Sequence, residues 1–262
     1  MVLLMSGRIA PFVFLILSLV LIYYKQRMSE RGSVPFIRRV PALDAIEEAV
    51  GRCAELGRPL LMELGYTDTG LRGQWAGSIL AASTTMAYVA GVCARSGVRM
   101  IVTPAYPEIL PLVYETVKTE YSAAGAIDDY HEDNIIYFSN QQFPWATGVM
   151  GTLEREKCGA HIGIGPYHAE SLMVAEAGAK VGAMQILGTP RNSQLPFFVA
   201  CADYTIIGEE VYAIGAYLSK EAGQIGTIAG QDWVKILVIA ITIIGILTVS
   251  AGSNMILNLL NM

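Results

Sequence analysis

The chain has 262 residues, of which 53% are hydrophobic and only 16% charged, and its formal net charge is −5. The apolar excess lies at the two ends, which excludes an entirely soluble protein and predicts membrane segments attached to a soluble-type domain. The negative balance argues against nucleic acid as a partner, because nucleic-acid-binding proteins usually present a basic face.

The first predicted element is an apolar segment, residues 9–24, that carries no charge and closes on a tyrosine pair suited to the membrane interface. Residues 1–24 are therefore predicted to form a transmembrane anchor. A cleaved signal peptide is the alternative, but no small-residue cleavage site follows, and Lys25 directly after the tyrosines is typical of a stop.

Residues 25–40 are predicted to form a basic juxtamembrane linker. It contains a single acid, Glu30, and five basic residues: Lys25, Arg27, Arg31, Arg38 and Arg39. On the other side of the apolar segment, the one charged side chain is Arg8. By the positive-inside rule, the chain from residue 25 onward is expected in the cytoplasm. The lipid bilayer is accordingly the first expected partner.

The carboxyl-terminal end mirrors this arrangement. Residues 222–233 are predicted to be a flexible linker, and residues 234–262 a transmembrane helix with a short tail, with Trp233 and Lys235 marking the cytoplasmic interface. Both flanks predict a two-pass protein of the inner, or cytoplasmic, membrane with both termini outside and the main domain, residues 41–221, in the cytoplasm.

The domain alternates short apolar runs with helical patterns. Strands are predicted at 59–64, 98–103, 134–139, 161–165, 183–188 and 204–207, whereas 196–201 is open between strand and helix. Helices are predicted at 41–56, 75–95, 108–123, 141–157, from 170 onward and at 209–220. The predicted fold class is α/β: a Rossmann-like, mostly parallel sheet of about five to six strands with helices on both faces, flanked by one amino-terminal and one carboxyl-terminal transmembrane helix.

Five polar corners follow the predicted strands, and in open parallel sheets ligands bind outside the carboxyl ends of the strands. These corners supply a set of candidate ligand-binding residues: Tyr66, Tyr106, Glu108, Tyr167, His168, Glu170 and Asn192. A purely structural role is the alternative, because proline opens helices and glutamate suits their first turn.

Cofactor and metal sites are not predicted. The pair Gly163 and Gly165 begins a dinucleotide pattern, but His168 occupies the place of its third glycine. Glu108 and Glu170, each in the first turn of a helix, would compete with a bound phosphate for the same backbone amides. Three histidines without ligand spacing argue against a metal.

Catalytic residues are not identified either. Ser171 lacks the Gly-x-Ser-x-Gly elbow that would activate it as a nucleophile. Whether the protein is an enzyme therefore stays open, with the balance against it.

Three runs resemble a family of prokaryotic membrane proteins catalogued only as a domain of unknown function. They are QFPWATGVMGTLEREK, AESLMVAEAGAKVGAMQILGT and QLPFFVACADYTIIGEEVYAIGAYLS. The resemblance covers about residues 41–233 and implies a cytosolic α/β domain between membrane segments. It brings no established catalytic residue to any position of this chain.

Two functional hypotheses follow from the sequence. The first is a non-enzymatic, membrane-anchored α/β module that forms homo-oligomers and has a scaffold or assembly role at the membrane. The second is a sensor or enzyme for a small-molecule ligand, with a polar pocket at the carboxyl ends of the strands.

Overall fold

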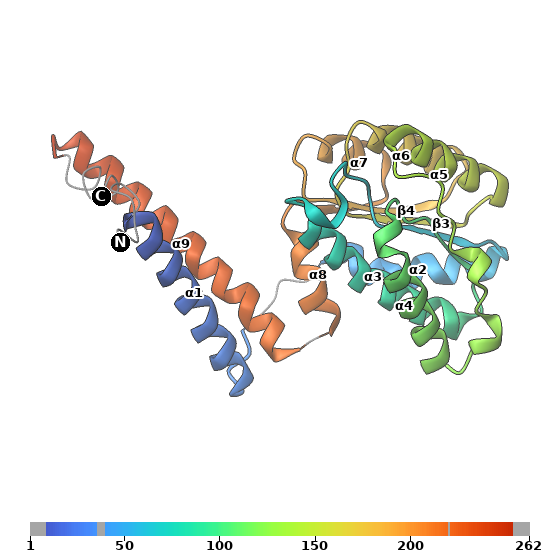
Figure 1. Ribbon diagram of the computed structural model, residues 1–262, viewed down its shortest axis with the longest axis horizontal. Coiled ribbons are helices and arrows are strands. Elements are labelled where there is room, and N and C mark those ends of the chain that lie inside the picture. The colour runs from blue at the N-terminus through green and yellow to red at the C-terminus, as the bar shows by residue number, and fades with distance from the viewer. Residues whose placement is uncertain (1–8, 36–39, 220, 254–262) are drawn as a thin grey trace. The chain divides into compact units, whose positions relative to one another are not determined.

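The computed structural model describes residues 9–35, 40–219 and 221–253 (Figure 1). The chain divides into two compact units, one made of Met1–Arg38 with Ser219–Met262 and the other of Arg39–Leu218. The second unit is thus inserted between the two halves of the first.

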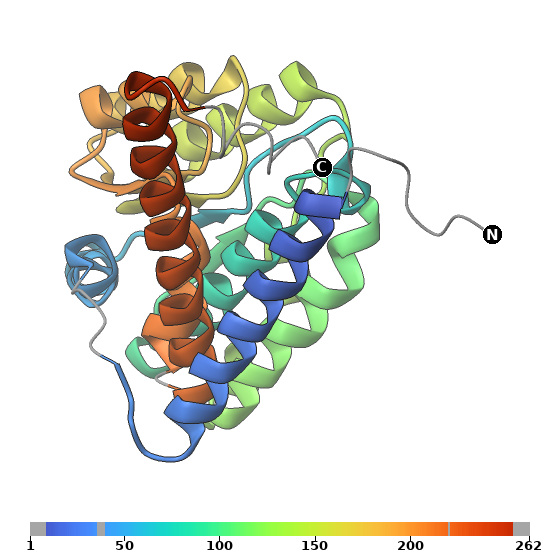
Figure 2. The ribbon, with the colours of Figure 1, turned by 90° about the vertical axis from the view of Figure 1, so that its left-hand side faces the viewer.

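The first unit is a pair of antiparallel helices, α1 (Ile9–Glu30) and α9 (Ala222–Ser250), which run side by side in Figures 1 and 2. Two glycines of α9 permit the close packing. A Cβ atom on Gly226 would lie 2.7 Å from the Cα of Gln26, and one on Gly230 would lie 2.6 Å from the Cα of Ile22. Small residues at this spacing are typical of closely packed membrane helices.

Two polar contacts join the same ends of this helix pair. Ser29 Oγ donates a hydrogen bond to the carbonyl of Ala222 at 2.5 Å, and Lys25 Nζ lies 4.5 Å from the ring centroid of Trp233. Residues 222–233 were predicted to be a flexible linker, but in the structure they form the first turns of α9. Their glycines face the neighbouring helix, which compensates for their low helix propensity.

The second unit is built on five parallel strands in the order β2-β1-β3-β4-β5. The strands are β1 (Leu60–Glu63), β2 (Met100–Val102), β3 (Ala160–Ile164), β4 (Met184–Thr189) and β5 (Tyr204–Ile207). Every residue of the first four strands is buried, as expected for a parallel sheet covered on both faces. The predicted α/β class with a parallel sheet is confirmed.

Helices cover both faces of this sheet (Figure 1). One face carries α2 (Pro41–Leu56), α3 (Ala76–Ser96), α4 (Leu110–Ala123) and α8 (Glu210–Ser219), and the other carries α5 (Gln142–Glu156), α6 (Glu170–Lys180) and α7 (Leu195–Cys201). Four short 3-10 helices lie in the connections: Gly70–Arg72, Pro107–Ile109, Ile127–Asp129 and Glu132–Asn134.

Local sequence explains where these helices begin and end. Proline stands at the start of α2, where its missing amide costs nothing, and Gly57 ends that helix in the left-handed conformation at φ 60°. The stretch 196–201, open between strand and helix from its sequence, belongs to α7, with Pro196 in the first turn.

The strand predicted at 134–139 is wrong. Only Ile135 forms a bridge, with Val102, and the amide of Ile136 donates to the carbonyl of Val102 at 2.8 Å. Strand β2 has only three residues and its chain turns away directly afterwards, so it offers no longer ladder to a sixth strand.

Three helices of the described residues are long and apolar enough to cross a membrane, namely α1, α3 and α9, rather than the two that the sequence predicts. They differ in what surrounds them. In α3, 61% of the apolar window is buried inside the structure, against 0% in α1 and α9. Helix α3 is therefore a core helix of the α/β unit.

Candidate functional site

The strand order creates a topological switch point between β1 and β3. From β1 the chain runs first to β2 on one side, and after β2 it crosses to β3 on the other side. In doubly wound sheets, ligands bind where the strand order reverses, outside the carboxyl ends of the strands. The loops that begin at Leu64 and Gly165 leave the sheet at this place.

These two loops touch backbone to backbone. The amide of Tyr66 donates to the carbonyl of Pro166 at 2.6 Å. Gly65 has φ 73°, and a Cβ atom there would lie 2.3 Å from that same carbonyl oxygen. Gly165 has φ 145°, and its Cβ would lie 2.2 Å from the carbonyl oxygen of Leu64. Only glycine permits this approach at either position.

Tyr66 stands at the centre of an aromatic cluster above the switch point. Its ring centroid lies 6.2 Å from that of Tyr106, 5.9 Å from Trp145 and 6.2 Å from His168. Its hydroxyl donates to the carbonyl of Asn140 at 3.2 Å. Burial, with smaller effects from neighbouring carboxylates, raises the pKa of Tyr66, so its phenol stays protonated at neutral pH.

The other two candidate tyrosines are also buried. Tyr106 accepts a hydrogen bond from the amide of Thr67, and Tyr167 packs edge-on against Phe198 at 4.8 Å between centroids. Burial raises the pKa of both phenols far above the ordinary value for tyrosine. These side chains form an uncharged aromatic floor.

A charged rim lies beside this floor. His168 is partly exposed, at 28%, and its Nε2 lies 3.3 Å from Asp68 Oδ1. Arg191 Nη1 lies 2.7 Å from both ring nitrogens of His168, and the guanidinium carbon lies 5.6 Å from the ring centroid of Trp75. Arg191 can only donate hydrogen bonds, whereas the Asp68 carboxylate can only accept them. The rim can therefore meet both anionic and neutral polar groups.

Glu170 belongs to the same cluster, but its oxygens are already occupied. It is fully buried, and it accepts hydrogen bonds from the amide of His168 at 2.8 Å and from Gln142 Nε2 at 2.5 Å. A carboxylate in this position holds the loop before α6 and the start of α5 together. Its bonds are those of a structural residue.

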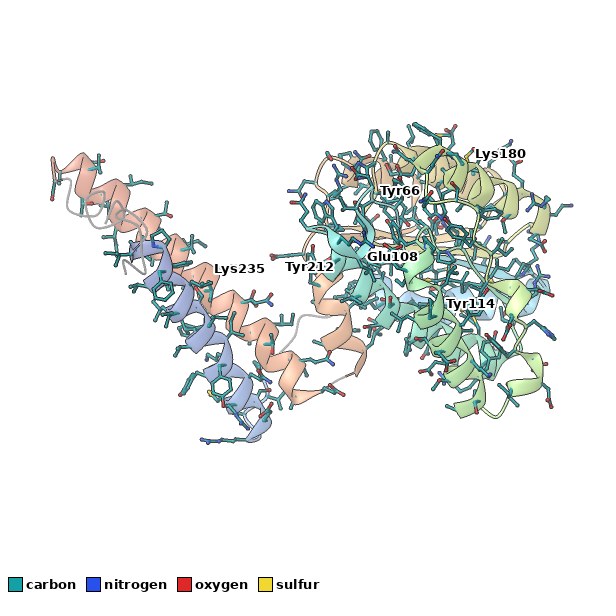
Figure 3. The ribbon with its side chains drawn as sticks, viewed as in Figure 1. Tyr66, Glu108, Tyr114, Lys180, Tyr212 and Lys235 are labelled. Atoms are coloured by element: carbon teal, nitrogen blue, oxygen red, sulfur yellow. The ribbon has the colours of Figure 1, made fainter. Side chains whose placement is uncertain are left out.

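The remaining two candidates lie further out. Glu108 is exposed, and its Oε1 lies 2.5 Å from where a Cβ on Gly70 would stand (Figure 3). Asn192 is exposed as well, and its Oδ1 lies 3.8 Å from where a Cβ on Gly208 would stand. The structure thus joins Tyr66, Tyr106, His168 and Glu170 through direct contacts, and Tyr167 is linked to them through Trp145. Glu108 and Asn192 lie at the periphery.

Sequence reasoning missed a buried polar network directly beneath this cluster. Glu63, the last residue of β1, is fully buried, and its Oε1 lies 2.8 Å from His161 Nε2 and 3.0 Å from the hydroxyl of Tyr167. Gln185 Oε1 lies 2.9 Å from His161 Nδ1. The available signal was Glu63 itself, the one acid inside an otherwise apolar strand.

The partners of Gln185 fix the protons of this network. Gln185 Nε2 donates to the carbonyl of Cys201 at 3.0 Å, so Gln185 Oε1 accepts and His161 Nδ1 carries a proton. One further proton lies between His161 Nε2 and Glu63 Oε1. Counted together, Glu63 and His161 are electrically neutral, which is how a carboxyl group is tolerated in a fully buried position.

The fold and the site together define a class: doubly wound α/β proteins with strand order 2-1-3-4-5 and polar side chains at the switch point. Within that class, the chain belongs to the family described as "Domain of unknown function (DUF6754)", which matches residues 2–260 and so includes both apolar ends. No curated protein and no solved structure matches this chain.

Proposed function

We propose that the protein is a two-pass membrane protein in which α1 and α9 anchor the α/β domain at the cytoplasmic face of the inner membrane. The observation that carries this proposal is the outward-facing apolar surface of both helices. Val13 and Leu19 of α1 are 57% and 58% exposed, and Ile236 and Leu247 of α9 are 55% and 63% exposed. A bilayer would cover this apolar surface, whose exposure to water costs roughly 25 cal/mol per Å².

Residues at one end of the helix pair support the orientation. Lys25, Arg27 and Arg31 follow the apolar part of α1, and Lys235 precedes the apolar part of α9. Trp233 lies against Lys25 at this end, as expected for an interfacial aromatic residue. The basic end is proposed to face the cytoplasm.

The topology is tested with a reporter that is active only in the cytoplasm. Inserted after Gly125, in an exposed loop at φ 71°, the reporter should be active, because this loop belongs to the inserted α/β unit. The same reporter fused after Ser253 should be inactive. Activity at the second position combined with silence at the first would reverse the proposed orientation.

We further propose that the domain acts without catalysis and by self-association. Several large apolar side chains on both faces of the α/β unit are more than half exposed, which supports contact with other copies: Leu80, Phe143, Val199 and Ile207. Sedimentation of the detergent-solubilised chain at micromolar concentration should give a dimer or larger assembly. A monomer under these conditions would remove self-association from the proposal.

Binding of a small molecule at the switch point is the second candidate function. The convergence of Tyr66, His168 and Arg191 at one strand edge favours it. Because Trp75 lies under Arg191 and Trp145 under Tyr66, a ligand should change tryptophan emission. A panel of small polar metabolites is expected to contain at least one with a saturable response that Arg191→Ala weakens about tenfold, roughly 1.4 kcal/mol. A panel without any response would argue against this function.

A further inference from the structure

Two fully buried side chains at the switch point each leave one polar atom without a hydrogen-bond partner among the described residues. They are Glu63, through Oε2, and Thr103, through Oγ1. A buried polar atom left unpaired is disfavoured, and native proteins keep few of them. Two at one place indicate that a further group belongs there.

The register of the sheet puts these two side chains next to each other. Met62 pairs with Val102, and the amide of Thr103 donates to the carbonyl of Met62 at 3.0 Å. Glu63 and Thr103 are the next residues along β1 and beyond β2, so they stand side by side and point to the same face. This is the face covered by α5, whose Trp145 donates its indole N–H to the carbonyl of Thr103 at 3.0 Å.

The Glu63 carboxyl group is held in a fixed orientation. Its Oε1 is bound by His161 Nε2 and by the hydroxyl of Tyr167, which leaves Oε2 as the free acceptor. Gly163, beside Glu63 in the register, makes room for this arrangement. A Cβ atom at Gly163 would lie 2.6 Å from Tyr167 Oη and 2.7 Å from Glu63 Oε1. A polar group preorganised in this way is typical of a binding site.

The two free atoms define the group that would satisfy them. Glu63 Oε2 accepts a hydrogen bond, and Thr103 Oγ1 can both donate and accept. A single hydroxyl group can donate to the first and accept from the second. Glu63 and His161 together are neutral, and the side chains bonded to Thr103 and Glu63, Trp145 and Tyr167, are uncharged. The ligand that fits best is therefore neutral.

We propose that Glu63 and Thr103 bind the hydroxyl group of a small neutral molecule at the switch point. The inference deepens the second candidate function and rests on ligand binding at this strand edge. The Glu63 side chain supplies the acceptor, Thr103 completes the pair, and His161 and Tyr167 are positioning residues that orient the carboxyl group.

The indole N–H of Trp145 is a local reporter, because it is bonded to Thr103 itself. In the ¹⁵N-labelled full chain in detergent, its resonance is assigned with a Trp145→Phe variant, and the probes are ethanol, ethylene glycol and glycerol. At least one probe should shift the resonance with a saturable midpoint. Methylammonium and acetate, which differ in charge, should not.

Three variants separate binding from folding. Thr103→Val keeps the shape of the side chain and should raise the midpoint at least tenfold, whereas Thr103→Ser keeps the hydroxyl and should preserve it. Thr152→Val is the matched control, since Thr152 is a buried threonine of α5 whose hydroxyl already donates to the carbonyl of Gly148 at 2.9 Å. It should leave the midpoint unchanged.

Two outcomes overturn the inference. One is the lack of a saturable shift with any hydroxyl probe, together with an experimental structure in which a single water bridges Glu63 and Thr103. The other is a shift with the same midpoint in Thr103→Val as in the wild type. In the second case, a ligand whose affinity still falls in the Arg191→Ala variant would leave the proposed function intact and place the binding site on the rim alone.

Discussion

Replacing His161 with leucine is expected to lower the free energy of unfolding of the full chain by about 3–5 kcal/mol. The substitution removes the partner of Glu63 Oε1 and of Gln185 Oε1 in a site where all three side chains are almost fully buried. The measurement is equilibrium unfolding by denaturant in detergent, followed through the emission of the buried Trp145. Emission from Trp75 and Trp233 is removed by substitution with phenylalanine in every variant compared.

A second variant shows whether the unpaired carboxyl group causes this loss. Adding Glu63→Leu to His161→Leu removes the buried acid and should recover part of the stability, but not all, because Tyr167 Oη and Gln185 Oε1 stay unpaired. The control Lys180→Ala breaks an exposed ion pair with Glu154 and should cost about 0–1 kcal/mol. A His161→Leu variant as stable as this control would contradict the described network.

Gly65→Ala is expected to destabilise the chain by several kcal/mol. The left-handed backbone at φ 73° costs an alanine about 1–2 kcal/mol, and its Cβ would stand 2.3 Å from the carbonyl oxygen of Pro166, an overlap that costs roughly another 1–3 kcal/mol. The same unfolding experiment measures the loss.

Gly57→Ala is the matched control, because Gly57 has a similar φ of 60° and no atom within 4 Å of the Cβ position. Its loss should be about 1 kcal/mol, since it contains only the backbone contribution. If both variants lose the same amount, the loops after β1 and β3 are not in the close contact described here.

The fold was predictable where burial alone decides the pattern. Strands β3 and β4 are mostly apolar runs, and in the structure every residue of both is buried. Two predictions were wrong for the same reason: in each case a neighbouring element determines the local structure. Residues 134–139 have strand-like composition, but β2 is too short to pair with them beyond Ile135. The glycines of 222–233 indicated flexibility, whereas α1 packs directly on them.

The candidate site was predictable in outline, because strand ends in a parallel sheet gather at one edge. The sequence therefore named Tyr66, Tyr106 and His168, which do meet. It could not show that Glu170 is occupied by Gln142, a contact between distant segments. Nor could it single out Thr103, whose unpaired hydroxyl becomes visible only when the register of β1 and β2 is known.

The contact between the two ends of the inserted unit has a consequence for how the chain assembles. Tyr217 Oη in α8 donates to Asp44 Oδ1 in α2 at 2.7 Å, so the folded domain brings its entry and exit points together. Pairing α1 with α9 then closes a short loop in place of one that runs through the whole domain. Each halving of loop length is worth about 0.6 kcal/mol, and three or four halvings give roughly 2 kcal/mol. Unfolding the domain should therefore loosen the helix pair, even though no residue of the pair has changed.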